Sequence, residues 1–460
     1  SGILAIRAAL DAEVNITYKI LYNDAVAMTG GQEIGDNWNV DGIIKQVLAE
    51  GVKKISVLSQ DPKKYKYLSS KYVKSVHRDH IISEQVNLSK HKGVSVLIFD
   101  QTCAAEKRRR RKRGQMHDPL QRIMINPDVC EGCGDCSMQS SCVSIEPLET
   151  KLGRKRKINQ STCNKDYTCL KGFCPSFVSV DAQLQARTTS HKIDGLPDPK
   201  HKVSDGVSNI ILTGIGGTGV LTVSAITAMA AHYEGKESTI LDMTGLAQKG
   251  GAVWSHIKIY EKNVKTFSHK IAPASANLFL ACDAVVGTKP EIQEVLSDKK
   301  TYSIINSDTI PVADFVTNRD LDFKDDEVLK VIDKTTKDID ITVPAIKIAE
   351  NLCGDAIAAN IMMLGAAYQL GHIPLKEESI KYAIKLNGIG VEKNIYSFNL
   401  GRLYAFNPKD KIFKFLNSFK EKEQTTESVL TDRLERLAIY DKKEIDFFNS
   451  KVNFTKDLIK

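Results

Sequence analysis

The segment Asn209-Ile-Ile-Leu-Thr-Gly-Ile-Gly-Gly-Thr-Gly219 gives the clearest fold signal in this chain of 460 residues. It reads as an apolar strand that enters a tight turn, after which a helix begins. Asp242 ends the next expected strand, 23 residues beyond Gly219. In this context the turn is the dinucleotide fingerprint G-x-G-x-x-G, in which backbone N–H groups at the start of the helix bind a phosphate. The glycines of the pattern are Gly214, Gly216, Gly217 and Gly219.

Two interpretations of this glycine loop stay open. One is a site for NAD or FAD. The other is a tight strand–helix turn in a Rossmann-like domain that binds no nucleotide, or that binds the phosphate of another ligand. Either way, we expect an α/β domain over residues 208–407, followed by a helical, charged region over 408–460. The expected strands are 210–212, 239–241, 253–259, 284–286 and 302–305, with helices at about 355–370 and 377–386.

The N-terminal part of the chain also alternates between helix and strand. Such alternation predicts a parallel sheet with helices on both faces. Residues 102–120 are polar and basic and read as a connector, so this domain is assigned residues 1–120. The chain begins in what reads as the middle of a helix, and we expect truncation before Ser1. The expected helices are 2–11 and 40–50, and the expected strands are 15–22, predicted to be buried, 54–58 and 94–99.

Seven of the ten cysteines lie in the cysteine segment, defined as residues 121–185. Its first loop has the spacing C-x2-C-x2-C, which lets one loop bind three corners of a cubane cluster while a remote Cys-Pro supplies the fourth. By that rule Cys130, Cys133, Cys136 and Cys174 bind one 4Fe–4S cluster. Three further cysteines could bind a second, doubtful cluster for which one ligand is missing. They are Cys142, Cys163 and Cys169.

The cysteine spacing departs from the ferredoxin pattern after Cys136 and again in the second half of the segment, and zinc is the alternative metal. Residues 186–207 contain Pro197 and Pro199 and read as a linker. Because clustered ligands need reduced thiols, and no secretory signal opens the chain, we expect a cytoplasmic protein.

The formal net charge is +8, and seven positive charges lie in the run Lys107–Arg113. The rest of the chain is close to neutral, which argues against a general nucleic-acid-binding protein. The run can be a solvated segment, a surface that steers an acidic ferredoxin, a signal for nucleic-acid binding or nuclear targeting, or a contact between subunits. No stretch reaches the roughly 18 apolar residues of a membrane helix, so no membrane partner is expected.

Several stretches of the sequence resemble the indolepyruvate:ferredoxin oxidoreductase family, and together they cover nearly the whole chain in the family's order. They are Asn15-Ile-Thr-Tyr through Thr29-Gly-Gly-Gln32, Asp100-Gln-Thr-Cys through the basic run to Arg113, the cysteine segment through Cys174-Pro-Ser-Phe, Gly245-Leu-Ala-Gln-Lys-Gly-Gly-Ala252, and Gly354-Asp-Ala-Ile-Ala-Ala-Asn360.

The resemblance implies an oxidative decarboxylase of aryl-pyruvates, in which coenzyme A takes the acyl group and ferredoxin takes the electrons. It implies an α/β protein with four parts: a partial parallel-sheet domain for thiamine diphosphate, a ferredoxin-like cysteine segment, a Rossmann-like γ-type domain and a helical C-terminal piece. A homo-oligomer is expected. The family's pyrimidine-binding half and its Gly-Asp-Gly element should precede Ser1, and a further region should follow Lys460. This fragment alone is therefore expected to be inactive.

The resemblance also implies cofactor-binding residues. Mg²⁺ and thiamine diphosphate would be bound by the Asn23 side chain and the Ala25 carbonyl, with the glycine loop Thr29, Gly30 and Gly31 beside the diphosphate. Lys249, Gly250 and Gly251 would line the site near the diphosphate or coenzyme A. The alternatives are a turn after a strand at residues 23–24 and an ordinary turn at residues 249–251. No catalytic acid–base residue can be assigned.

Two other functions compete with this one. An iron–sulfur electron-transfer subunit linked to NAD or FAD would use the glycine loop and Asp242. A non-enzymatic binding module would use the cysteines to bind zinc.

Overall fold

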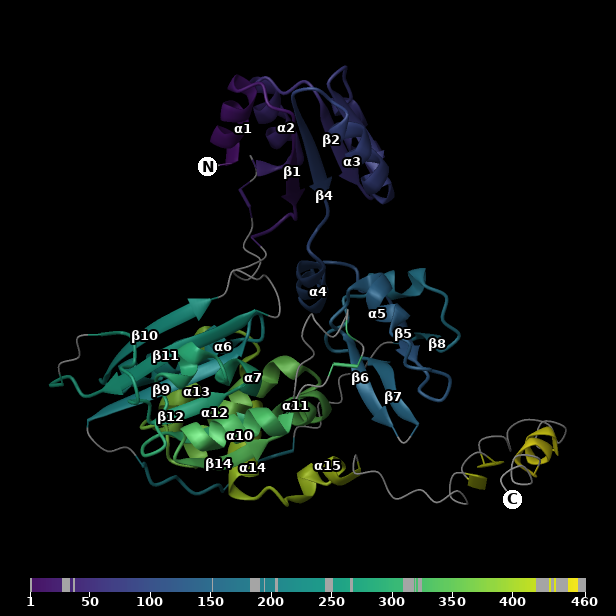
Figure 1. Cartoon of the computed structure of the whole chain (residues 1–460). Coiled ribbons are helices and arrows are strands. Elements are labelled where there is room, and N and C mark those ends of the chain that lie inside the picture. The colour runs from purple at the N-terminus through teal and green to yellow at the C-terminus, as the bar shows by residue number, and fades with distance from the viewer. Residues whose placement is uncertain are drawn as a thin grey trace.

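The structure is a computed structural model in which three parts surround a short helix (Figure 1). These parts are an N-terminal domain (residues 2–100), the cysteine segment and a C-terminal α/β domain (residues 206–407). No helix within the described part of the chain is long and apolar enough to cross a membrane. The described residues are 2–26, 34–35, 38–150, 152–182, 191–193, 195–202, 206–244, 251–264, 268–308, 318, 320–321, 325–418, 430–431, 434–435 and 446–453.

The N-terminal domain is a four-stranded parallel sheet with the strand order β1-β4-β2-β3. Val57 and Ile98 pack with α1 and α2 on one face, and Leu58 and Leu97 pack with α3 on the other. The prediction of helices on both faces is therefore confirmed. The elements are α1 (Gly2–Asp11), β1 (Ile16–Tyr22), α2 (Val40–Ala49), β2 (Ile55–Ser59), η2 (Pro62–Leu68), β3 (Val73–His77), η3 (Arg78–His80), α3 (Ile81–Ser89) and β4 (Val94–Asp100).

One prediction in this domain was wrong. The stretch 15–22 was expected to be a buried strand, but no residue of β1 is buried. The reason is its place in the sheet: β1 is an edge strand, whereas all five residues of β2 are buried between neighbours. The basic stretch expected to be a plain connector contains α4 (Ala104–Lys112).

The cysteine segment consists of two small antiparallel sheets. β5 (Gln121–Ile125) pairs with β8 (Phe177–Asp181), and β6 (Ile145–Thr150) pairs with β7 (Gly153–Ile158). The short helices α5 (Asp135–Ser140) and η4 (Thr168–Lys171) contain the cysteines Cys136 and Cys169. Among the described residues of this segment, its buried cluster comprises Ile125, Cys130, Cys136 and Ile145.

The C-terminal α/β domain has a six-stranded mixed sheet with the order β10-β11-β9-β12-β13-β14. Helices α6, α11 and α12 pack on one face, with α13 and α14 outside them, while α8 and α10 cover the other face. The elements are β9 (Val207–Ile215), α6 (Val220–Tyr233), β10 (Glu237–Thr244), β11 (Ala252–Tyr260), β12 (Leu278–Ala281), α7 (Ala284–Gly287), α8 (Pro290–Gln293), β13 (Tyr302–Asn306), α10 (Asp325–Thr335), β14 (Asp338–Val343), α11 (Ala345–Cys353), η5 (Ala356–Ala358), α12 (Ala359–Gln369), α13 (Glu377–Asn387) and α14 (Val391–Phe406).

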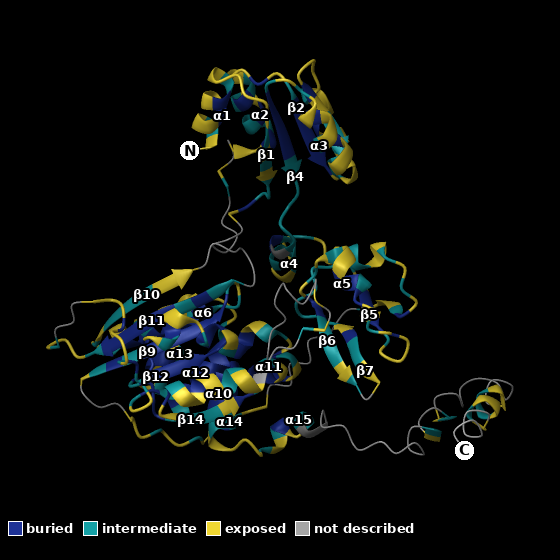
Figure 2. Cartoon of the chain, viewed as in Figure 1, coloured by how far each residue is buried: buried dark blue, intermediate teal, exposed yellow. Residues whose placement is uncertain are grey.

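The largest apolar core among the described residues lies in this domain (Figure 2). Ten of the eleven residues of α12 are buried. Its backbone approaches α14 so closely that a Cβ on Gly365 would lie 2.0 Å from the Phe398 carbonyl oxygen, and one on Gly401 would lie 1.9 Å from that of Met362. Only glycine permits this approach.

The expected strand at 284–286 was wrong, because these residues form α7. Asp283 precedes them as an N-cap whose carboxylate accepts a hydrogen bond from the Val286 N–H, 2.9 Å away. A capped start favours a helix over a strand for the β-branched residues that follow. The strand of this region is β12, a few residues earlier.

After α14 the structure describes η6 (Lys411–Phe413), α15 (Phe415–Ser418) and a few short pieces up to residue 453. The expected helical region 408–460 lies mostly outside the described residues.

Candidate functional site

Asn23 follows β1 at the carboxyl edge of the N-terminal sheet. In that sheet Tyr22 is in register with Asp100 at the end of β4, which is in register with Ser59 at the end of β2. Open parallel sheets bind ligands at this edge. Within the described residues the Asn23 side chain has no hydrogen-bond partner, so its amide oxygen is available to a ligand.

The neighbours of Asn23 fix the turn. Asp24 has a φ of 62°, and Arg110 donates hydrogen bonds to its Oδ2 at 2.7 Å and to its carbonyl oxygen at 2.9 Å. Ala25 is only 2% exposed. The predicted ligands Asn23 and Ala25 therefore lie in one fixed turn, whereas Thr29, Gly30 and Gly31 lie outside the described residues.

Asp100 is a polar group at the same edge that was not assigned a role from the sequence. Its Oδ2 accepts hydrogen bonds from the Tyr65 hydroxyl at 2.6 Å and from the Ser59 hydroxyl at 3.3 Å. Burial and the hydrogen bond to Asp100 raise the pKa of Tyr65 above its usual value. A polar residue directly after the apolar strand 94–99 was the available sequence signal.

The glycine loop lies between β9 and α6, as predicted. Gly217 and Gly219 have φ of 87° and 94°, and a Cβ on Gly214 would lie 2.4 Å from Val220 Cγ2. The Gly216 N–H donates to the Gly251 carbonyl oxygen at 2.9 Å. Two motifs singled out from the sequence, the glycine loop and the end of the Lys249–Gly251 stretch, thus meet in one place. Lys249 and Gly250 lie outside the described residues.

Asp242 does not occupy the position of the acidic residue in a dinucleotide site. In the fingerprint its strand should adjoin the strand before the glycine loop, but β11 lies between β9 and β10. Its Oδ1 accepts hydrogen bonds from Ser255 at 2.5 Å and Ser224 at 3.2 Å. This arrangement disfavours the NAD or FAD interpretation, and phosphate binding by the glycine loop stays a prediction.

Two cysteines of the first group, Cys130 and Cys136, lie near a buried arginine. Cys130 and Cys136 are 8% and 7% exposed, Cys133 is exposed, and Cys174 Sγ lies 2.9 Å from the Ser176 hydroxyl. Burial raises the pKa of Cys136. Arg156 on β7 is 1% exposed, and its nearby charge lowers the pKa of Cys136. A cationic side chain beside these thiols was not predicted from the sequence.

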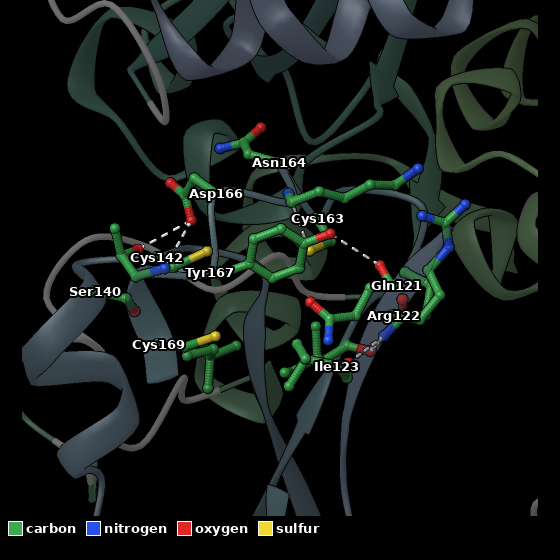
Figure 3. Close-up of a pocket in the computed structure, with 15 residues that line it drawn as sticks. Gln121, Arg122, Ile123, Ser140, Cys142, Cys163, Asn164, Asp166, Tyr167 and Cys169 are labelled. Atoms are coloured by element: carbon green, nitrogen blue, oxygen red, sulfur yellow. Dashed lines mark hydrogen bonds between the residues drawn. The ribbon is translucent and has the colours of Figure 1, made fainter. Parts of the chain in front are cut away.

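The second cysteine group lines a single pocket (Figure 3). Cys142, Cys163 and Cys169 come from three places in the sequence and face the same space, whose volume is about 420 Å³ including the part open to solvent. Burial, followed by the charges of Cys163 and Cys142, raises the pKa of Cys169 to about 11. The structure therefore brings together the three residues that were predicted to share a second cluster.

Across the described residues, no three His, Cys, Asp or Glu side chains converge as ligands of one metal ion. A cubane cluster differs from a single ion because each of its irons takes one cysteine. The iron–sulfur prediction thus depends on the spacing of the thiols and on their division into two groups.

The basic run forms α4, which connects the three parts of the molecule. Besides the Arg110–Asp24 pair, Arg108 donates to the Thr162 carbonyl oxygen at 2.5 Å and Arg111 to the Asn164 carbonyl oxygen at 2.6 Å. Lys112 pairs with Asp355 of the C-terminal α/β domain at 2.7 Å. Most of the run is therefore engaged by the protein, unlike a solvated segment.

Glu350 on α11 joins the C-terminal α/β domain to the cysteine segment directly. Its Oε1 accepts hydrogen bonds from Asn159 Nδ2 at 2.6 Å and from the Ser161 hydroxyl at 3.2 Å, and burial raises its pKa. A polar pocket of about 1470 Å³, counted with the part open to solvent, lies here between α4, the cysteine segment and α11.

The C-terminal α/β domain is a part of the chain that is similar to known proteins. Residues 209–404 match the family model described as pyruvate ferredoxin/flavodoxin oxidoreductase. The indolepyruvate oxidoreductase subunit IorB of Archaeoglobus fulgidus is 27% identical over 196 residues, covering 42% of this chain and 92% of the relative. The ketoisovalerate oxidoreductase subunit VorA of Methanothermobacter marburgensis is 29% identical over 214 residues, covering 46% of this chain and 39% of the relative.

Two solved structures are similar over the same share of the chain. Pyruvate oxidoreductase subunit PORC from Thermotoga maritima is 21% identical, with a TM-score of 0.31, covering 43% of this chain and 96% of that one. The 2-oxoglutarate:ferredoxin oxidoreductase from Magnetococcus marinus is 17% identical, with a TM-score of 0.33, covering 44% of this chain and 32% of that one. The family match and these relatives support the resemblance found in the sequence over the C-terminal α/β domain, where residues 209–404 match the pyruvate ferredoxin/flavodoxin oxidoreductase model.

Proposed function

We propose that the chain is part of a 2-oxoacid:ferredoxin oxidoreductase that decarboxylates an aryl-pyruvate such as indolepyruvate, gives the acyl group to coenzyme A and passes electrons to ferredoxin. One observation supports this proposal most. Helix α4 contacts the turn at Asn23 and the loop of the second cysteine group through hydrogen bonds, and it contacts the C-terminal α/β domain through an ion pair. A carbon-oxidising site and an electron relay have to be adjacent, and in the proposal α4 is the element that connects them.

In this proposal the carboxyl edge of the N-terminal sheet binds Mg²⁺ and thiamine diphosphate. The Asn23 amide oxygen and the Ala25 carbonyl are the hard oxygen donors that Mg²⁺ prefers, and Arg110 fixes the turn between them. Thr29, Gly30 and Gly31 are assigned to the diphosphate. Thiamine diphosphate, when bound, supplies the carbanion stabilisation that loss of carbon dioxide requires.

The cysteine segment is assigned the electron relay. Cys130, Cys133, Cys136 and Cys174 would bind one 4Fe–4S cluster. Arg156 beside these thiols is suited to offset negative charge on the cluster, which raises its reduction potential. Its positive charge acts on Cys136 and Cys130, the two buried thiols of this group.

The C-terminal α/β domain is assigned the binding of phosphate groups. The hydrogen bond between Gly216 and Gly251 brings the glycine loop to the last residue of the Lys249–Gly251 stretch. In the proposal these residues, with Gly214, Gly217 and Gly219, bind phosphates of thiamine diphosphate or coenzyme A at the start of α6.

In the proposal the basic run is not the surface that binds ferredoxin. Arg108, Arg110, Arg111 and Lys112 already contact protein groups, so in the proposal α4 connects the parts and does not steer ferredoxin. Cys133 is exposed and offers the electron exit closest to solvent. We further propose that the enzyme is a homo-oligomer and that it acts in the cytoplasm.

The test is an anaerobic assay of the enzyme that contains these residues, with indolepyruvate, coenzyme A, thiamine diphosphate, Mg²⁺ and ferredoxin. We expect ferredoxin reduction that depends on coenzyme A and is abolished by Cys136→Ser but kept by Cys353→Ser, which changes a buried thiol of the C-terminal α/β domain. Reduction of the iron by NADH alone would support an NAD-linked electron-transfer subunit instead. Zinc in place of iron would support the binding module.

A further inference from the structure

The second cysteine group lacks one ligand, and the two cysteine loops can be compared to find it. The first loop is Cys130-x2-Cys133-x2-Cys136, and the second is Cys163-x2-Asp166-x2-Cys169. The second loop has the same spacing, with an aspartate where the first has its middle cysteine.

The two loops also share a backbone conformation. In the first loop Gly132 and Gly134, which flank Cys133, have φ of 73° and 81°. In the second loop Lys165 and Tyr167, which flank Asp166, have φ of 52° and 58°. Left-handed residues other than glycine are uncommon and carry strain, so two of them around one aspartate mark a constrained loop.

The correspondence continues into the helix that follows each loop. Helix α5 begins at Asp135, one residue before Cys136, and η4 begins at Thr168, one residue before Cys169. Asp166 therefore stands where Cys133 stands in the first loop, and both residues are exposed.

Asp166 also lines the same pocket as Cys142, Cys163 and Cys169 (Figure 3). Its Oδ1 accepts hydrogen bonds from the Thr168 N–H at 3.2 Å and the Thr168 hydroxyl at 2.9 Å. Its Oδ2 accepts none within the described residues. The adjacent Lys165 pairs with Asp118 and not with Asp166. One carboxylate oxygen is thus held in place and the other is free for a metal.

We propose that Asp166 is the fourth ligand of a second 4Fe–4S cluster, whose other ligands are Cys142, Cys163 and Cys169. This inference rests on the iron–sulfur part of the proposed function. A carboxylate is a harder ligand than a thiolate and suits a cluster iron less well. The iron bound to Asp166 is therefore the one most easily lost.

The loss has a defined chemistry. Ferricyanide takes one electron from a 4Fe–4S cluster in its 2+ state, one ferrous ion leaves its oxygen ligand, and a 3Fe–4S cluster in its 1+ state remains. The three thiolate ligands stay bound to the remaining irons. The product has an EPR signal distinct from that of the intact cluster.

The experiment measures iron, acid-labile sulfide and the EPR spectrum of the anaerobically purified chain before and after ferricyanide. Wild type is expected to hold about eight irons before oxidation and about seven after it, with a three-iron signal. Asp166→Cys should keep about eight irons and show no such signal, and Asp166→Ala should lack the labile iron from the start. Asp181→Cys, an exposed change at the end of β8, should behave as wild type.

Three results would overturn the assignment while leaving the proposed function intact. They are a wild type with only about four irons per chain, a wild type that loses no iron on oxidation, and an Asp166→Cys variant with the three-iron signal of wild type. Absence of iron and sulfide from every preparation would instead overturn the proposed function itself.

Discussion

The C-terminal α/β domain buries an extended apolar core on both faces of its sheet, including nearly all of α12. The cysteine segment beside it buries four residues in its own cluster, and two of them are the cysteines Cys130 and Cys136. Figure 2 shows the same contrast between the two parts. A segment of this size with so little apolar burial needs a metal, a disulfide or a neighbour to stay folded.

The difference suggests a division of roles. The C-terminal α/β domain supplies a rigid frame whose stability comes from packing, and the cysteine segment gains its stability from a bound metal and from contacts with that frame. The four predictions below test this division, from the largest expected effect to the smallest.

Removal of iron should unfold the cysteine segment alone. Because its fold depends on ligand bonds, amides of β5–β8 should lose at least about tenfold in hydrogen-exchange protection when a chelator removes the metal. Amides of α12 and β12 should keep theirs. Hydrogen-exchange mass spectrometry with and without chelator makes the measurement. Equal protection of β5–β8 in both states would show that the segment folds without metal.

Cys136→Ala should remove one cluster, lowering iron per chain by about half, because Cys136 is a predicted ligand and the last cysteine of its loop. Cys353→Ala is the matched control in the C-terminal α/β domain. It should leave iron unchanged and cost about 1 kcal/mol of stability, since it removes only one small buried thiol group. Iron analysis and denaturant unfolding separate the two effects. An unchanged iron content in Cys136→Ala would contradict the assignment.

Acid should weaken the C-terminal α/β domain through His256, which lies on β11 and is 2% exposed. Burial, with the charges of Lys270 and Lys258, lowers the pKa of His256 to about 4 from its ordinary value of 6.5. Between these two values the unfolded state binds more protons than the folded state, so stability falls as pH falls. The full loss is about 3 kcal/mol.

Urea unfolding of the C-terminal α/β domain from pH 7 to pH 4 measures this effect. His256→Asn should flatten the pH dependence, whereas His232→Asn, which changes an exposed histidine at the end of α6, should not. A wild-type stability that stays level across this range would rule out the His256 contribution.

The contact between the two regions should give the smallest effect. Asn159→Ala and Glu350→Ala should show a coupling of about 1 kcal/mol in a double-mutant cycle, because their 2.6 Å hydrogen bond is partly buried. Lys45 and Asp41, an exposed pair on α2, provide a control cycle with a weaker expected coupling. Additive effects at residues 159 and 350 would mean that the two regions are stabilised independently.

Local sequence patterns predicted the elements that depend on local chemistry. The strand, glycine loop and helix from residue 207 to 233 follow the prediction, as do β1, β2, β4, α1 and α2 in position. The wrong predictions concern burial and secondary structure that depend on tertiary contacts or on a neighbouring capping residue. Whether β1 is buried depends on its edge position, and residues 284–286 form a helix because Asp283 caps them. Neither fact is visible in hydrophobic periodicity.

The candidate site divides in the same way. The C-x2-C-x2-C spacing and the remote Cys-Pro separated the first cysteine group from the other three cysteines of the segment, and the structure places those three around one pocket. Sequence patterns could not reveal that the basic run contacts Asp24, Thr162 and Asn164, because such contacts join residues distant in sequence. Arg156 was missed for the same reason, since a charged residue on an amphipathic hairpin normally faces water.

Iron, acid-labile sulfide and zinc, measured together in the anaerobically purified chain, test the metal-dependent cysteine segment most directly. Iron and sulfide in equal amounts, with zinc below stoichiometry, are the result expected from two cubane clusters. Stoichiometric zinc, or a folded cysteine segment with neither iron nor sulfide, would contradict an electron relay at these cysteines.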